Sequence, residues 1–275
     1  MLTILFIGIA VSLLLYYLIW YWGHRGHRQI ARGIQTLNAL EAVQASYRAG
    51  DYQTGLQQSE ALKRGSSKTP EYCFFRGTML HQLGRFVEAE ASLREGVPLE
   101  SELHRRALAS NTLGVVLMDK RYPEAIAAFE EALRMWPDRG TGHREVAEVW
   151  LRQRRELPEA LQRARRALEV DRTSQAPTAE THNLRIAEDA SLLAWAIAAN
   201  SGDVREVEAL LAEAFPLSAN SAKPIQAQVH FYAGKAYAAL NMQEKSASQF
   251  SEASKVDPQG QFGRMARAML AQTAQ

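Results

Sequence analysis

The sequence contains one cysteine, Cys73, so the chain cannot form an internal disulfide. It also lacks a strong charge of either sign, because 32 lysines and arginines stand against 30 acidic residues. So balanced a charge does not favour nucleic acid as the main partner. Gly-rich phosphate loops, nucleophile elbows and zinc-binding helix motifs are absent as well. We therefore expect a protein that is not an enzyme, with no catalytic residues, cofactor or metal.

Two short patterns resemble sites only superficially. The stretch "RGTGHRE" at 139–145 contains Gly-x-Gly, but it follows Pro137 at a helix end and no strand precedes it. We interpret it as a turn between helices. His24 and His27 stand three positions apart with no other ligand near them in the sequence, which is too few for a metal site.

The N-terminus carries the longest apolar run, "LTILFIGIAVSLLLYYLIWYW" from Leu2 to Trp22. Its 21 residues include no charge, and as a helix they extend roughly 31 Å, about the thickness of a bilayer core. Tyrosines and tryptophans crowd its end, as in an interfacial aromatic belt. A cleaved signal peptide would have a basic start and a small-residue cleavage site, and neither is present. The run predicts a single transmembrane anchor over 2–22, with the lipid bilayer as one partner.

A basic juxtamembrane segment at 23–35 follows the span. Arg25, Arg28 and Arg32 lie on this side, whereas only Met1 precedes the span. The excess of arginine predicts a single-pass membrane protein whose body is cytoplasmic. The alternative is a body on the outer, periplasmic side of the inner membrane.

The remainder of the chain repeats with a period near 34 residues. Gly50 corresponds to Gly84 and Tyr52 to Phe86, each at an offset of 34. The stretch "RYPEAIAAFEEALRMWPD" at 121–138 has its apolar residues on one helical face, with alanine at positions 125 and 132 of that face. Small residues on an apolar face predict a helix pressed closely against a neighbour.

These stretches resemble the tetratricopeptide repeat (TPR) family, whose period is 34 residues in a helix–turn–helix unit. The pattern residues in three copies are Gly77, Leu83, Gly84, Phe86, Ala89 and Leu93; Leu113, Gly114, Leu117, Ala125, Phe129, Ala132 and Pro137; and Gly234, Tyr237, Phe250, Ala253 and Pro258. The resemblance implies an all-α fold, an α-solenoid of TPR helix–turn–helix repeats following the single N-terminal transmembrane helix.

The repeats predict a solenoid over 36–258. We expect about six helix pairs, at 36–68, 70–103, 107–138, 140–172, 184–216 and 225–258. The array is irregular around 173–224, where "RTSQAPTAETH" and "PLSANSAKP" interrupt the period. A C-terminal capping helix over 259–275 has Phe262, Met265 and Met269 at helical spacing and is expected to cover the last apolar surface.

Small residues also recur at one position in the first helix of successive pairs, namely Gly77, Gly114, Ala147, Ala194 and Gly234. At a helix crossing, a larger side chain would hold the two backbones apart. We expect large residues of the second helix, such as Phe129 and Phe250, to fill the space beside each crossing.

The resemblance implies a binding scaffold whose ligands lie in a concave groove lined by the first helix of each pair. The expected groove residues are Phe74, Thr78, His81, Asn111, Val115, Met118, Arg144, Glu148, Trp195, Phe231 and Lys235. The positions of the Lys/Asn/Arg clamp that some TPR domains use for carboxylates are Phe74, Thr78, Thr112, Thr141 and Glu145 here, so that clamp is absent. A mixed apolar and polar groove favours an extended or helical peptide.

The expected function is therefore a membrane-anchored, non-catalytic TPR adaptor for a protein or peptide partner. The alternative is an envelope-assembly or chaperone-like TPR protein on the outer side of the inner membrane. The segment 144–172 has eight arginines, but its acidic residues offset most of them at helical spacing. It favours a solvated charged face and not a nucleic-acid site.

Overall fold

The computed structural model describes residues 34–63, 67–118, 121–176, 178–200 and 202–273. The predicted membrane span at 2–22 and most of the basic segment at 23–35 lie outside these residues. Within the described part, every helix is too short or too polar to cross a bilayer.

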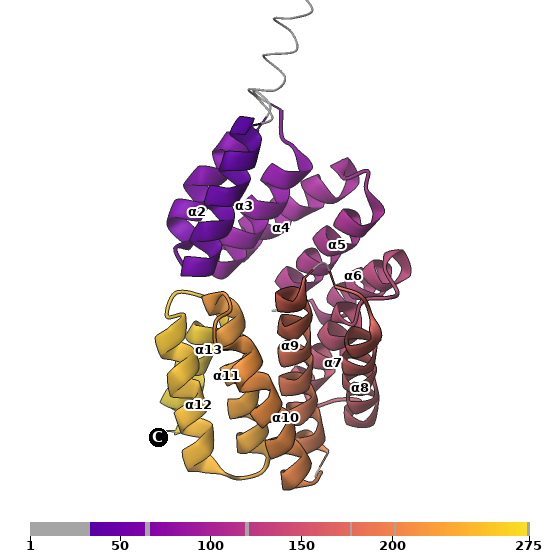
Figure 1. Ribbon diagram of the computed structural model, residues 1–275, viewed down its shortest axis with the longest axis vertical. Coiled ribbons are helices and arrows are strands. Elements are labelled where there is room, and N and C mark those ends of the chain that lie inside the picture. The colour runs from indigo at the N-terminus through magenta and orange to yellow at the C-terminus, as the bar shows by residue number, and fades with distance from the viewer. Residues whose placement is uncertain (1–33, 64–66, 119–120, 177, 201, 274–275) are drawn as a thin grey trace, which may run out of the picture.

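All regular elements of the described chain are helices (Figure 1). Residues 34–49 form the first helical segment. The helices that follow are α2 (Tyr52–Ser59), α3 (Pro70–Gln82), α4 (Phe86–Gly96), α5 (Leu103–Leu117), α6 (Tyr122–Met135), α7 (Thr141–Gln153), α8 (Leu157–Thr173), α9 (Ala179–Ala199), α10 (Val204–Ser218), α11 (Lys223–Ala239), α12 (Gln243–Val256) and α13 (Gln261–Thr273). Short 3₁₀ turns, η1 (Glu60–Leu62) and η2 (Val97–Leu99), extend α2 and α4. Segment 34–49 pairs with α2, and each later odd-numbered helix up to α11 pairs with the next one.

Local chemistry sets where these helices begin. The Thr69 hydroxyl accepts a hydrogen bond from the Tyr72 N–H at the start of α3, and Pro70 occupies the first turn. Thr178 caps α9 in the same way by accepting from the Thr181 N–H. These caps satisfy backbone N–H groups that the helices themselves leave unpaired.

Positive backbone φ angles mark the turns within the first two pairs. Gly50 and Gly84 have φ of 75° and 76°, the left-handed conformation that glycine adopts without steric cost. The two glycines are the positions that the repeat equates at an offset of 34. In later pairs the corresponding turns contain Arg154 and Asn241, with φ of 52° and 59°.

The expected close packing inside the pairs is confirmed at three glycines. A Cβ atom placed on Gly77 would lie 2.6 Å from Cγ of Leu93, and one on Gly234 would lie 2.6 Å from Cδ1 of Phe250. At Gly114 the same atom would lie 2.5 Å from Cε1 of Phe129. Each glycine therefore provides the space that a large side chain of the paired helix fills. Ala125 and Phe129 of α6 are fully buried, which explains the small residues on that apolar face.

The irregular region is more helical than its sequence indicates. Helix α8 continues to Thr173 and α9 begins at Ala179, so the break at 172–182 is short. Helix α10 runs through Pro216 to Ser218. Helix α9 is 21 residues long and contacts α7, α8, α10 and α11.

Helices from the two halves of the described chain contact each other, since α2 and α3 lie next to the C-terminal helices (Figure 1). The Tyr52 phenol donates a hydrogen bond to Asp257, which directly follows α12. The Gln261 N–H donates to Oε1 of Gln82 at 3.0 Å, and the Arg264 guanidinium donates to the carbonyl of Gln82. These contacts join α2 and α3 to the C-terminal helices. The helices consequently surround the concave side as a partly open cavity, whereas the sequence predicts only a groove.

Candidate functional site

A cavity of about 760 Å³ occupies the centre of this closed array. Its walls come from segment 34–49 and from α3, α5, α7, α9, α11 and α13, together with the turns before α7, α9 and α11. Thus the first helix of each pair faces the cavity, and α13 completes the wall. The volume lies in the range of ligand-binding cavities in proteins.

Most of the predicted groove residues line this cavity. Those that do are Phe74, Thr78, His81, Asn111, Val115, Met118, Arg144 and Glu148. Phe74, Val115 and Met118 supply apolar surface, while the others supply polar groups. The lining is therefore mixed in character along α3, α5 and α7.

The remaining three predicted residues do not line the cavity. Trp195 and Phe231 are buried, with 4% and 2% of their surface exposed, and both belong to the main hydrophobic core. The Phe231 ring lies 5.6 Å from both the Phe250 and Phe262 rings, centroid to centroid. The Lys235 ammonium lies over the Trp195 ring at 5.3 Å. These residues belong to the C-terminal half, against whose core Phe262, Met265 and Met269 of α13 pack.

Arg144 of α7 is the centre of a buried charge cluster. Its Nη1 lies 3.0 Å from Oε2 of Glu188 and 3.3 Å from Oδ1 of Asp189, and its Nη2 lies 3.2 Å from Oε1 of Glu145. Although burial alone would lower the pKa of Arg144, these carboxylates raise it well above its ordinary value. Both terminal nitrogens of the guanidinium are thus engaged inside the protein wall, while its buried Nε has no hydrogen-bond partner among the described residues.

Burial raises the pKa of Glu145 to about 7, and the neighbouring Glu148 and Glu188 carboxylates add to this effect against the opposing Arg144. Burial likewise raises the pKa of Asp189 well above its ordinary value. A buried carboxylate with this many acidic neighbours favours its protonated form. The cluster therefore holds less negative charge near neutral pH than its formal count.

A second polar chain links α7 with α11 across the base of the cavity. Oε2 of Glu148 accepts a hydrogen bond from the Tyr232 hydroxyl at 2.6 Å, and its Oε1 accepts from Nε of Arg152 at 2.8 Å. Glu148 is only 2% exposed, so both of its partners are needed to compensate for its burial. Like Arg144, it acts first as a structural residue.

His81 is the predicted groove residue most altered by its environment. Burial lowers its pKa to about 3, and the nearby Arg264 and Arg152 guanidiniums act in the same direction. The imidazole is accordingly neutral at physiological pH. Only 3% of the His81 surface is exposed. Its uncharged imidazole contributes a polar but neutral group to the cavity wall.

Residues outside the sequence prediction also line the cavity. Tyr47 and Arg48 come from segment 34–49, Arg139 from the turn before α7, and Glu188 from α9. The sequence pattern places Arg139 in a turn between helices, and that placement is correct. Nothing in the pattern indicates that this turn faces the concave side. The regular spacing of Glu180, Leu184 and Glu188 on α9 was the one available signal for that wall.

The arginine-rich segment behaves largely as a charged outer face. Arg166 pairs with Glu169 at 2.8 Å within α8, and Arg172 pairs with Glu213 of α10 at 2.6 Å. These side chains are about half exposed. In the described residues, no group of three or more His, Cys, Asp and Glu side chains is arranged to hold a metal ion.

Comparison with known proteins supports the repeat assignment. Residues 119–177 match the sequence model of the tetratricopeptide repeat family. No curated protein sequence matches this chain. Among solved structures, PilF of Pseudomonas aeruginosa is similar with a TM-score of 0.51 and 13% identity, over 87% of this chain and 99% of that one. At that identity the likeness concerns the fold alone.

Two further structures are more distant. MamA from Desulfovibrio magneticus RS-1 has a TM-score of 0.46 and 16% identity, over 67% of this chain and 96% of its own. YrrB, described as a TPR protein with an unusual peptide-binding site, has a TM-score of 0.35 and 19% identity, over 72% of this chain and 91% of its own. Residues 119–177 therefore carry a TPR-like sequence, and the described chain is an array of paired helices with a fold similar to that of PilF.

Proposed function

We propose that this chain is a membrane-anchored TPR scaffold that holds a segment of a partner protein inside its central cavity and has no enzymatic activity. The observation that carries the proposal is the central, partly open cavity of about 760 Å³, lined by the first helix of every pair. TPR proteins commonly mediate protein interactions, and the absence of catalytic motifs from the sequence agrees with such a role.

The walls of the cavity favour a peptide over a small apolar ligand. Phe74, Val115 and Met118 alternate with hydroxyl, amide and charged groups along the lining. An extended or helical segment presents both apolar side chains and backbone polar groups, which a mixed lining complements. Because α2 and α3 contact the C-terminal helices, the segment enters along the cavity axis as a chain end, or it enters after this contact opens.

Substitution of a cavity residue by tryptophan tests the proposal. Thr78 lines the cavity and its hydroxyl donates to the Phe74 carbonyl at 2.9 Å. Thr173 makes the same i to i−4 bond, to Glu169 at 2.9 Å, at the exposed end of α8. We expect Thr78→Trp to fill the cavity and abolish co-purification of the partner from gently solubilised membranes.

The matched variant Thr173→Trp is expected to retain the partner. Both variants need the circular dichroism spectrum of the wild type before the comparison is made. Retention of the partner by a folded Thr78→Trp protein would contradict a cavity-bound partner.

The membrane anchor rests on the uncharged run from Leu2 to Trp22. We expect the full chain to remain in the membrane fraction after alkaline carbonate extraction, and a variant lacking residues 2–22 to be released. The arginines after the span favour a cytoplasmic body. Reporter fusions after Gln275, one active only in the cytosol and one only outside it, test this side; activity of the external reporter would place the scaffold in the periplasm.

A further inference from the structure

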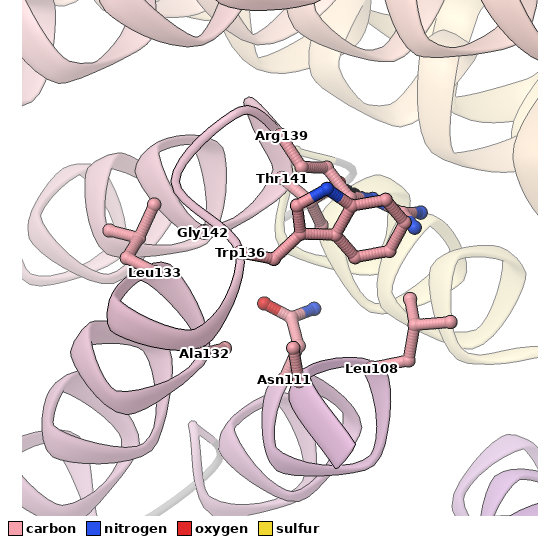
Figure 2. A pocket seen from close by; sticks show the side chains of 9 residues that line it. Leu108, Asn111, Ala132, Leu133, Trp136, Arg139, Thr141 and Gly142 are labelled. Carbon is pink, nitrogen blue, oxygen red and sulfur yellow. Dashed lines mark hydrogen bonds between the residues drawn. The ribbon is translucent and has the colours of Figure 1, made fainter. Parts of the chain in front are cut away.

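The wall of the central cavity contains a small recess where α5 meets the turn between α6 and α7 (Figure 2). Leu108, Asn111, Arg139 and Thr141 line both the recess and the cavity. The recess alone measures about 20 Å³, room for roughly one water-sized group. It is therefore a side pocket of the cavity, sized for one functional group of a larger ligand.

Arg139 differs from Arg144 and Arg152, the two arginines of α7 that line the cavity. Arg144 contacts three carboxylates and Arg152 contacts Glu148. Among the described residues, no carboxylate oxygen lies within 4.0 Å of the Arg139 guanidinium, so Arg139 forms no ion pair. Its Nε donates to the Thr141 hydroxyl at 2.8 Å, and no partner in the described chain engages its terminal nitrogens.

The charged groups around Arg139 do not supply the missing counter-charge. Burial lowers its pKa to about 10, and the Arg185 and Arg144 guanidiniums add to that effect more than Glu188 and Asp171 oppose it. A cation held among other cations is stabilised by an incoming anion. The guanidinium is also fixed in place, since it lies over the Trp136 ring at 4.9 Å.

The second feature of the recess is Asn111 of α5. Its side chain projects toward the Trp136 indole, and the Arg139 side chain lies beside the same ring (Figure 2). Oδ1 of Asn111 is enclosed and accepts no hydrogen bond from the described residues. An enclosed acceptor without a donor is costly, so a ligand that brings an N–H group there gains a bond that the protein leaves open.

Trp136 forms the side of the recess that faces Asn111 (Figure 2). Its ring stacks on the His104 imidazole at 4.4 Å between centroids, with an angle of 22° between the planes. This contact fixes the indole, and the indole in turn supports Arg139. The recess therefore presents its cation and its acceptor in a fixed arrangement, which reduces the entropic cost of binding.

We propose that the opening of this recess into the cavity is a carboxylate subsite: on the cavity side Arg139 receives a carboxylate of the bound peptide, and Oδ1 of Asn111 accepts an N–H of the same peptide. The inference rests on the proposed peptide-binding function. The carboxylate comes from an aspartate or glutamate side chain or from a free C-terminus. A single guanidinium with Glu188 and Asp171 in its surroundings suits a monoanion better than a doubly charged phosphate.

The test uses the full chain in detergent micelles with ¹⁵N-labelled arginine. The Nε–Hε resonance of Arg139 is identified by its loss in Arg139→Gln. Two carboxylate probes are titrated, N-acetyl-aspartate methylamide for a side chain and N-acetyl-alanine for a C-terminus. We expect at least one to shift this resonance saturably with a millimolar dissociation constant, and the tighter of the two identifies the source.

The neutral isostere N-acetyl-asparagine methylamide is expected to bind roughly tenfold more weakly or worse, because it lacks the charge-assisted bond. The subsite would be overturned if N-acetyl-aspartate methylamide and N-acetyl-asparagine methylamide shifted the resonance equally, or if neither carboxylate probe shifted it. Tighter binding of inorganic phosphate than of both carboxylate probes would also overturn it. Arg134→Gln on the outer face of α6, where Arg134 pairs with Glu131, is the matched control and is expected to bind as wild type.

The role of Asn111 is tested separately with Asn111→Leu, which removes the acceptor at similar volume. We expect it to weaken the tighter carboxylate probe severalfold. Unchanged affinity in a folded variant would overturn the part assigned to Asn111.

Failure of the subsite is distinguishable from failure of the proposed function. If Thr78→Trp releases the partner while Arg139→Gln retains it, the cavity binds the partner and the carboxylate subsite is wrong. If Thr78→Trp retains the partner, the peptide-binding function itself is wrong.

Discussion

The Tyr52 phenol donates a hydrogen bond to Oδ2 of Asp257, a residue 205 positions further along the chain. Both residues are buried, with 0% and 1% of their surface exposed. Burial raises the pKa of Asp257, while the bonds from Tyr52 and from the Gly260 N–H oppose that rise. This contact joins the first helix pair to the last, so the arrangement of helices around the cavity depends on a buried polar bond.

Removal of the Tyr52 hydroxyl is the direct test of this closure. We expect Tyr52→Phe to lose about 1–3 kcal/mol of unfolding free energy, because the buried Asp257 carboxylate loses a donor. Urea unfolding followed by circular dichroism measures the loss, and amide hydrogen exchange in α13 should accelerate. Tyr72→Phe is the control, since the Tyr72 hydroxyl bonds at 3.1 Å to Glu60, whose side chain is 54% exposed. A Tyr52→Phe protein no less stable than the control would contradict a closing role.

The close packing at Gly114 leads to a second prediction. A Cβ atom there would lie 2.5 Å from Cε1 of Phe129, so Gly114→Ala is expected to cost roughly 1–3 kcal/mol through overpacking. Thermal unfolding of the variant measures this cost. The double variant Gly114→Ala with Phe129→Leu should lose less than the sum of the two single changes, because the smaller leucine makes room. Additive losses would show that the two residues do not compete for the same space.

Local features of this fold are readable from the sequence. Gly50 and Gly84 end helices because only a left-handed turn continues the chain there, and that requirement repeats every 34 residues. Gly77 and Gly234 are small because a large side chain of the paired helix fills their space. Both constraints act between near neighbours in the chain, so a repeat pattern reveals them.

Long-range features are not readable in the same way. Whether Asp257 reaches Tyr52 depends on small rotations that accumulate over all the repeats. Trp195 was assigned to the groove from its place in a first helix, but α9 is surrounded by four other helices and its apolar residues enter the core. Arg139 lies in a turn, where the helical period says nothing about direction. The contact between Tyr52 and Asp257 and the positions of Trp195 and Arg139 could therefore be recognised only from the three-dimensional arrangement.

His81 predicts a loss of stability in acid. Its folded-state pKa of about 3 lies below the ordinary value of 6.5, so above pH 6.5 both states are neutral and the stability is fully present. As the pH falls below 6.5 the unfolded chain takes up the proton first, and the folded state loses about 1.4 kcal/mol per pH unit from this group. We expect His81→Gln to remove this component from urea unfolding between pH 7 and pH 5. A wild type and a variant with parallel pH profiles would contradict a buried neutral imidazole.

Substitution of Arg144 is expected to lower the stability of the fold, so it cannot report on binding alone. It lines the cavity, but its guanidinium already contacts Glu145, Glu188 and Asp189. Arg144→Met would leave these buried carboxylates without their cation, and we expect a loss of about 3–5 kcal/mol in urea unfolding. Arg134→Met, which breaks the exposed pair with Glu131, is expected to cost less than about 1 kcal/mol. Losses of equal size in the two variants would mean that the Arg144 cluster is solvated; a large loss for Arg144 alone would mean that its substitution disrupts the scaffold, leaving Arg139 as the better probe of what the cavity binds.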